Sequence, residues 1–142
     1  MIAYFDTSAL VPLLVTEAST DAYGDLWDHA DEVATVRLTY VEAAAAVARA
    51  LRLGRINTAT HDQARDILDA LWSRVTVIDV DEALMYAAAV NAADHNLRGY
   101  DAVHCAAAQR AAGGEFVAAT GDRTLLTAWA ALGITTFDAS QP

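Results

Sequence analysis

The sequence predicts an α/β fold in which a five-stranded, mainly parallel sheet is flanked by about seven helices, with an acidic site at the carboxyl-terminal edge of the strands. Short apolar or β-branched runs alternate with longer helix-like runs, the pattern of a parallel sheet covered by helices. The length of 142 residues predicts a single domain, residues 1–142. Carboxylates stand where strand-like runs end or helix-like runs begin, and in parallel α/β folds ligands bind at that edge.

Cysteine content and hydropathy restrict where the protein works. The single Cys105 cannot form an intrachain disulfide, which fits a reducing compartment. The first residues lack the basic segment and apolar core of a signal peptide, and no apolar run reaches the ~20 residues that span a bilayer. We therefore expect a cytoplasmic protein that has no membrane partner.

The net charge of −10 by itself disfavours a nucleic-acid partner, because an acidic surface repels phosphate. Acids gathered around a cation would weaken this argument, since the cation neutralises them locally. The chain contains no lysine, so its nine basic residues are all arginine, which forms paired hydrogen bonds with phosphate. An Ala- and Arg-rich proteome would produce the same bias.

The first elements follow from short local signals. The apolar run Ile2–Phe5 predicts a strand. Ser8–Val15 is typical of a helix in which Pro12 is tolerated only near the start. Ser19–Ala30 predicts a second helix, whose first residue is a suitable N-cap.

The middle of the chain continues the alternation. Glu32–Arg37 predicts a strand, and the Ala-rich run Thr39–Leu53 predicts a helix that ends at Gly54, a residue suited to the position after a helix. Thr58–Ser73 carries its apolar residues on one stripe, which predicts an amphipathic helix. Val75–Val80 is β-branched and predicts a strand.

The last part completes the sheet. Asp81–Asn96 predicts a helix capped by its first residue, and Asp101–Ala112 predicts a nearly apolar helix after a glycine that ends its predecessor. Glu115–Thr120 predicts a strand, Asp122–Leu132 a helix, and Ile134–Phe137 the final strand.

Four carboxylates at the junctions of these elements form the candidate site: Asp6, Glu42, Asp101 and Asp122. Four acids gathered at one sheet edge repel one another unless they share protons or hold a cation. A hard divalent cation with oxygen ligands keeps them all ionised. Asp101 opens a helix so apolar that we expect it to be central, and burial raises the cost of an unpaired charge there.

Each acid also has a purely structural interpretation. Asp6, Asp101 and Asp122 each precede a helix-like run and are good N-caps. Thr7 or Ser8 would serve that purpose as well as Asp6. The run from Thr39 to Glu42 matches a capping box, in which the glutamate binds back to the first amide of the helix.

In their order along the chain, these acids resemble the PIN domains, and within them the VapC-type toxins of toxin–antitoxin pairs. The resemblance rests on four stretches of this sequence. They are Phe5-Asp6-Thr7-Ser8-Ala9-Leu10, Thr39-Tyr40-Val41-Glu42, Arg98-Gly99-Tyr100-Asp101-Ala102-Val103-His104 with Ala106-Ala107-Ala108, and Thr120-Gly121-Asp122-Arg123-Thr124-Leu125. It spans essentially the whole chain.

The resemblance implies an endoribonuclease that depends on Mg²⁺ or Mn²⁺. It implies that the four carboxylates are the catalytic and metal-binding quartet, supported by the hydroxyls of Thr7, Ser8 and Thr120. It also implies a five-stranded parallel sheet, a homodimer that forms a higher assembly with antitoxin, and a small antitoxin partner. Because the protein is acidic, we expect that antitoxin to use a basic C-terminal segment.

Phosphodiester hydrolysis agrees with this assignment. The reaction needs a deprotonated water, an oriented phosphate and a stabilised leaving oxygen, and a carboxylate-held metal supplies all three. We expect Asp6 and Asp101 as the main direct ligands. Glu42 and Asp122 would bind through water or orient the nucleophile.

Five further residues are weaker candidates. Arg49, Arg52, Arg55 and Arg123 are candidate RNA contacts, although the first three also fit a solvated helix face. His104 lies one turn after Asp101 and could donate to the site, but a histidine in that position is more often a satisfied core or rim residue.

Three competing functions are less favoured. A receiver-type phosphoacceptor domain needs a lysine, and this chain has none. A haloacid-dehalogenase-like phosphatase needs a second aspartate where Ser8 stands. A catalytically idle interaction module of the same fold has no reason to keep the four acids.

Overall fold

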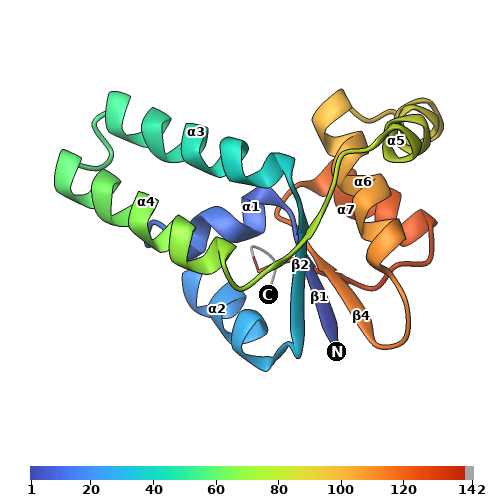
Figure 1. Ribbon diagram of the computed structural model, residues 1–142, viewed down its shortest axis with the longest axis horizontal. Helices are drawn as coiled ribbons and strands as arrows, with labels where there is room; N and C mark the ends of the chain where they lie inside the picture. Colours follow the sequence, from blue (N-terminus) through green and yellow to red (C-terminus); the bar gives the residue numbers. More distant parts are fainter. Residues whose placement is uncertain (140–142) are drawn as a thin grey trace.

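In the computed structural model, which describes residues 1–139, one parallel sheet runs through the molecule with strand order β3-β2-β1-β4-β5 (Figure 1). The strands are β1 (Ile2–Phe5), β2 (Glu32–Val36), β3 (Thr76–Ile78), β4 (Phe116–Ala119) and β5 (Thr136–Phe137). All four strand pairs are parallel. The five predicted strands and the parallel sheet are therefore confirmed.

The helical elements are α1 (Thr7–Leu10), the 3₁₀ turn η1 (Val11–Leu13), α2 (Thr20–His29), α3 (Leu38–Arg52), α4 (Thr58–Trp72), α5 (Glu82–His95), α6 (Gly99–Ala111) and α7 (Arg123–Ala131). None of these helices is long and apolar enough to cross a membrane.

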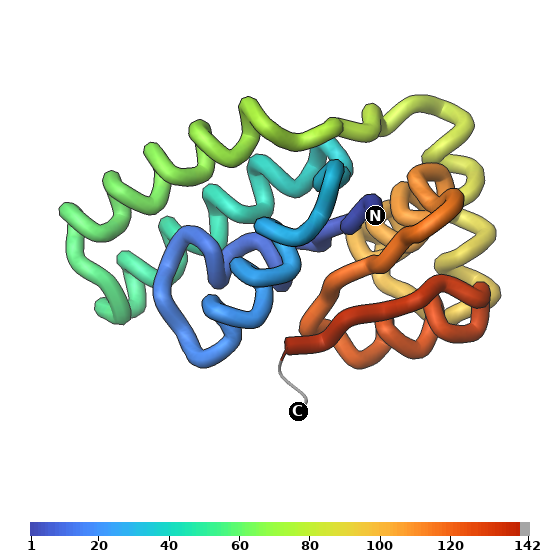
Figure 2. Tube along the Cα trace, turned by 90° about the horizontal axis from the view of Figure 1, so that it is seen from below, coloured from blue at the N-terminus to red at the C-terminus, as the bar shows by residue number. Residues whose placement is uncertain are grey.

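Side chains that alternate along β1 separate two layers of core. Ala3 and Phe5 pack with buried residues of α1 and α2, whereas Tyr4 faces a core contributed by α5, α6 and α7. A third apolar cluster joins η1 to α3 and α4, for instance through Val47 and Leu68. Figures 1 and 2 both place the α3–α4 pair on one side of the sheet and α5–α7 on the other.

β1 is the central strand, and its end defines the edge where the site lies. It pairs with β2 on one side and with β4 on the other, with Phe5 beside Ala119. The amide of Asp6 continues this ladder by donating to the carbonyl of Ala119 at 3.1 Å. The residues after β1 and β4 are therefore neighbours, as expected where parallel strands end at one edge.

The first helix differs from its predicted form. The single helix expected over Ser8–Val15 is α1 followed by the 3₁₀ turn η1, in which Pro12 occupies an early position. Proline lacks the N–H that an α-helix interior needs, so the chain tightens there. Ser19 sits at the N-cap of α2 as predicted, but its hydroxyl donates to Glu17 and makes no capping bond.

Two helices begin one or two residues before the predicted start, and the cap considered for each does not form. α3 begins at Leu38, and the hydroxyl of Thr39 accepts a hydrogen bond from Thr35, so the predicted capping box with Glu42 does not form. α6 begins at Gly99, which places Asp101 in its first turn and excludes it as the N-cap. The preceding helix ends instead at His95, because Asn96 adopts the left-handed conformation (φ 54°) that asparagine tolerates better than most residues.

The remaining boundaries deviate little. Asp81 caps α5 as predicted by accepting from the amide of Leu84 at 2.8 Å. The two edge strands are shorter than expected, since β3 keeps only Thr76–Ile78 and β5 only Thr136–Phe137. Each pairs with a single neighbour, so fewer of its residues are fixed in a ladder.

Candidate functional site

All four predicted carboxylates line one cavity of about 410 Å³ at the carboxyl-terminal edge of the sheet. The complete lining is Asp6, Thr7, Ser8, Val11, Pro12, Glu17, Glu42, Ala46, Asp101, His104 and Asp122. The fold thus brings together acids from the end of β1, from α3, from α6 and from the turn after β4. Glu17 also lies on this cavity, and no motif in the sequence indicated it.

Asp6 is the most buried of the four acids, with 4% of its surface exposed. Its Oδ1 accepts from the amide of Ala9 at 3.0 Å and from the hydroxyl of Ser8 at 2.7 Å. The hydroxyl of Thr120 donates to the other oxygen, Oδ2. Asp6 is therefore the N-cap of α1, but it also receives two hydroxyl donors that a simple cap does not need.

Burial raises the pKa of Asp6 above its ordinary value, and the electrostatic attraction of His104 together with the hydrogen bonds from Thr120, Ser8 and Ala9 only partly offsets this. A carboxylate in this position is costly to ionise without a cation beside it. The environment of Asp6 therefore favours a positively charged ligand.

Two hydroxyls tie the first acid to the fourth. Ser8 Oγ accepts from the amide of Gly121 at 2.8 Å, and Thr120 Oγ1 accepts from the amide of Asp122 at 3.0 Å. The two hydroxyls lie 3.2 Å apart. Asp122 itself caps α7, since its Oδ1 accepts from the amide of Leu125 at 2.9 Å. The supporting position predicted for Ser8 and Thr120 thus has a physical basis in the turn that carries Asp122.

Glu42 projects from the first turns of α3, and its Oε1 accepts two hydrogen bonds. Thr7 Oγ1 donates at 2.8 Å, and His104 Nε2 lies at 2.7 Å. Burial acts to raise the pKa of Glu42, but the hydrogen bond and electrostatic attraction of His104, together with the hydrogen bond from Thr7, outweigh it, so its pKa lies below the ordinary value. Glu42 is therefore ionised at neutral pH.

His104 combines burial with contact to the site. It is 3% exposed, as a core residue would be, yet its ring nitrogens contact Glu42 on one side and the hydroxyl of Tyr4 (2.8 Å) on the other. From the sequence, a satisfied core or rim histidine was the favoured interpretation, and these partners were not predicted. The available signal was its spacing of one turn from Asp101 on the same helix.

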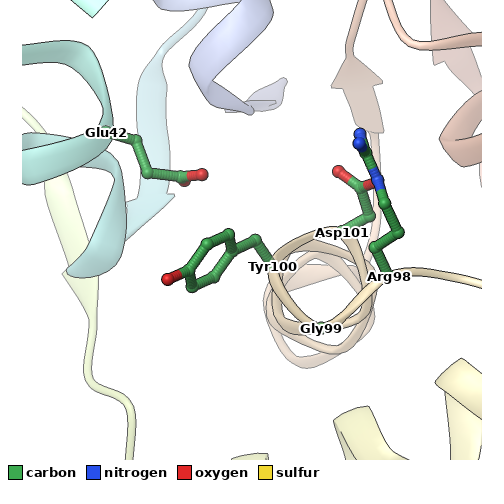
Figure 3. A pocket seen from close by; sticks show the side chains of 5 residues that line it. All are labelled: Glu42, Arg98, Gly99, Tyr100 and Asp101. Atoms are coloured by element: carbon green, nitrogen blue, oxygen red, sulfur yellow. The ribbon is translucent and has the colours of Figure 1, made fainter. Parts of the chain in front are cut away.

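Asp101 lies in the first turn of α6, where Nε of the exposed Arg98 is 3.4 Å from its Oδ2. A second cavity, of about 530 Å³, is lined by Glu42, Arg98, Gly99, Tyr100 and Asp101 (Figure 3). Figure 3 shows the ring of Tyr100 reaching from α6 toward α3, beside Glu42. This cavity shares Glu42 and Asp101 with the acid-lined cavity, so the two adjoin.

The four predicted arginines differ in position. Arg49 and Arg55 line a third cavity of about 390 Å³, which shares Val11, Glu17 and Ala46 with the acid-lined cavity. Arg52 and Arg123 are exposed, and within residues 1–139 neither forms an ion pair. The structure therefore brings two of the four beside the acids.

The donor set fits a hard divalent cation, because it consists of carboxylate and hydroxyl oxygens around a buried acid. In the described part of the chain, however, no three His, Cys, Asp or Glu side chains are placed so that they could jointly hold a metal ion. Mg²⁺ usually keeps several waters and is held by one or two carboxylates together with substrate phosphate. The arrangement matches that mode of binding and not a closed protein cage.

The raised pKa of Asp6 predicts that Asp6→Asn stabilises the metal-free protein at neutral pH. Folding shifts the pKa of this acid upward, so its ionised form costs stability above that pKa, and asparagine removes the charge while keeping the size. We expect a higher Tm for the variant at pH 7.5 in a chelator. The difference should shrink toward pH 4, where the wild-type side chain becomes protonated. A variant that melts lower than wild type at pH 7.5 would contradict this account.

Comparison with known proteins supports the fold. Residues 3–128 match the family model described as PIN domain. Two curated proteins of Mycobacterium tuberculosis, ribonuclease VapC45 of strain CDC 1551 / Oshkosh and ribonuclease VapC49 of strain H37Rv, are each 34% identical over 126 residues. That alignment covers 89% of this chain and 88% of each relative.

Solved structures share the architecture. PAE2754 from Pyrobaculum aerophilum superimposes with a TM-score of 0.70 at 25% identity, covering 96% of this chain and 83% of that one. The toxin VapC20 of Mycobacterium tuberculosis, described as cleaving the sarcin–ricin loop, gives 0.68 at 21% identity over 89% and 94% of the two chains. VapBC2 from Rickettsia felis, bound to a promoter DNA fragment, gives 0.66 at 14% identity over 97% and 98%. With an acid-lined cavity at the edge of a parallel sheet and a family match over most of its length, the chain belongs to the PIN-domain family.

Proposed function

We propose that this protein is a divalent-metal-dependent endoribonuclease and the toxin of a toxin–antitoxin pair. The observation that carries the proposal is the convergence of Asp6, Glu42, Asp101 and Asp122 on one cavity of a PIN-family chain. The relatives named ribonuclease VapC support RNA as the substrate.

A bound Mg²⁺ or Mn²⁺, held by Asp6 and Asp101 directly and by Glu42 and Asp122 through water, would supply an activated water and neutralise developing charge. Thr120 and Ser8 hold the carboxylate of Asp6 in one orientation. Glu42 keeps Oε1 on Thr7 and His104, which leaves Oε2 without a protein partner in the described part of the chain. That ionised oxygen orients a water by accepting its proton in a hydrogen bond.

Three adjoining cavities form the proposed RNA path, and their side chains offer contacts to both phosphate and base. Arg49 and Arg55 lie on one side of the acids and offer paired hydrogen bonds to phosphate. On the other side, Tyr100 is 67% exposed and offers a ring for a base to stack on, beside the exposed Arg98. The proposed RNA path therefore has arginines on both sides of the acids, although the protein as a whole is acidic.

One observation favours a second candidate, a catalytically idle module that binds only a protein partner. Each of the four carboxylates already has a partner within the protein, and no group of acids in residues 1–139 is preformed for metal. Metal binding separates the two candidates, because an idle module has no reason to bind Mg²⁺ or Mn²⁺.

The proposed partners are a second copy of the chain and a small antitoxin. Met85, Tyr86 and Val90 are exposed apolar residues of α5, which offers a dimer face away from the acid-lined cavity. The antitoxin would lay a basic C-terminal segment across the carboxylates and pair an arginine or lysine with them in place of metal. The VapBC complexes among the solved structures of this fold support a protein partner of this kind.

Metal titration is the first test. The metal-free protein should bind Mn²⁺ or Mg²⁺ and melt at a higher temperature in its presence, because a ligand that binds only the native state stabilises it by mass action. Calorimetry and thermal melting at millimolar metal measure both effects, and the variant Asp6→Asn should lose most of the response. Absence of heat and of any melting shift would favour the idle module.

Nuclease activity is the second test. Asp101→Asn preserves size but removes a ligand charge, so cleavage of a susceptible RNA should fall by about 10²-fold or more while the far-ultraviolet circular dichroism is unchanged. Asp94→Asn, at an exposed position of α5, is the matched control and should cut like wild type. Wild-type rates for Asp101→Asn would remove this residue from the site.

Inhibition is the third test. A cognate antitoxin should inhibit less as Mn²⁺ concentration rises, since its basic residue and the metal compete for the same carboxylates. Replacing that basic residue by alanine should weaken inhibition, and antitoxin binding should weaken similarly for Asp6→Asn. Full inhibition that is insensitive to metal would instead indicate binding away from the acids.

A further inference from the structure

A chain of hydrogen bonds runs from the buried Tyr4 through the buried His104 to the half-buried Glu42. Tyr4 Oη lies 2.8 Å from His104 Nδ1, and His104 Nε2 lies 2.7 Å from Glu42 Oε1. We propose that His104 is a positioning residue of the site, which fixes the Glu42 carboxylate through its Nε2–H, while the Tyr4 hydroxyl selects that ring tautomer. The inference rests on the proposed nuclease function only where it concerns activity.

The tautomer follows from the partners. A lone pair on Nε2 facing an ionised carboxylate oxygen at 2.7 Å would be repulsive, so Nε2 carries the proton and donates to Glu42. Nδ1 is then free to accept. The pKa of Tyr4 lies well above its usual value because the side chain is fully buried, so its hydroxyl keeps its proton. The proton on this hydroxyl can be donated to Nδ1 at 2.8 Å, and that donation satisfies the ring nitrogen.

The contact fixes one end of a flexible side chain. Glu42 has three rotatable side-chain bonds, yet Oε1 is held by donors from two other elements, Thr7 of α1 and His104 of α6. With Oε1 occupied, Oε2 is the oxygen left for a water or a cation. Thr7 and His104 would thus orient the Glu42 carboxylate without touching the substrate. Residues that hydrogen-bond to the ligands of a metal act in the same way.

Packing alone does not require a histidine here. Seven residues of α6 are buried, and apart from His104 they are alanine, valine or cysteine. An apolar side chain at this position would avoid burying a polar ring, and phenylalanine in place of Tyr4 would remove the matching hydroxyl. The paired presence of both polar groups is explained by the carboxylate that they reach.

The tautomer is tested first, without metal or RNA. Long-range ¹H–¹⁵N NMR of the metal-free protein at pH 7.5 should show His104 protonated on Nε2, with the His104→Gln spectrum identifying its signals. Tyr4→Phe should shift the Nδ1 resonance of His104. Tyr23→Phe removes another buried hydroxyl, one that has no contact with His104, and should leave the Nδ1 resonance of His104 unchanged. Protonation on Nδ1 in the wild type, or no response to Tyr4→Phe, overturns the proposal.

Function is tested with three substitutions at one position. His104→Leu should lower Mn²⁺ affinity or kcat by about 10–100-fold, the range typical of lost outer-shell partners, with little change in KM for RNA. His104→Gln places an amide donor near the former Nε2 and should recover much of the loss, whereas the shorter His104→Asn should not. Equal loss in all three variants, or none, overturns the positioning role. If the wild-type protein cleaves no RNA, the nuclease proposal fails. The NMR and Mn²⁺-binding results still decide whether His104 positions Glu42.

Discussion

The structure depends on a carboxylate buried at the end of its central strand. Asp6 lies directly after β1, and its amide extends the ladder to β4 while its side chain caps α1. It also anchors the hydroxyls of Ser8 and Thr120. A buried acid normally reduces stability, and here three donors only partly offset that cost. The remaining cost favours a positively charged ligand at this edge.

The other three acids are arranged around this one by separate elements. Asp122 is fixed by hydroxyl and amide hydrogen bonds in the turn after β4, and Glu42 by Thr7 and His104. Asp101 is held more loosely, by an arginine whose side chain is 86% exposed. A site that is rigid on the β1–β4 side and looser on the α6 side can admit a phosphate without disturbing the core.

Sequence reasoning succeeded where the signal is local. The alternation of apolar runs and helices predicted all five strands, and all four acids predicted at strand ends or helix starts line one cavity. It failed where a side chain has a choice of partners. Thr39 and Glu42 matched a capping box, but Thr39 accepts a hydrogen bond from Thr35, four residues earlier, and Glu42 binds His104, which only the tertiary fold brings near. Glu17 carries no motif, because its place on the acid-lined cavity comes from neighbours distant in sequence.

The hydrogen bond from the amide of Gly121 to Ser8 joins residues 113 positions apart. During synthesis, β1 therefore cannot pair with β4 until β4 and the turn after it have emerged from the ribosome. A nascent chain that stops before β4 contains Asp6, Glu42 and Asp101 but lacks Thr120 and one of the two strands that pair with β1. Translation itself thus postpones assembly of the acidic site until almost the whole polypeptide has been made.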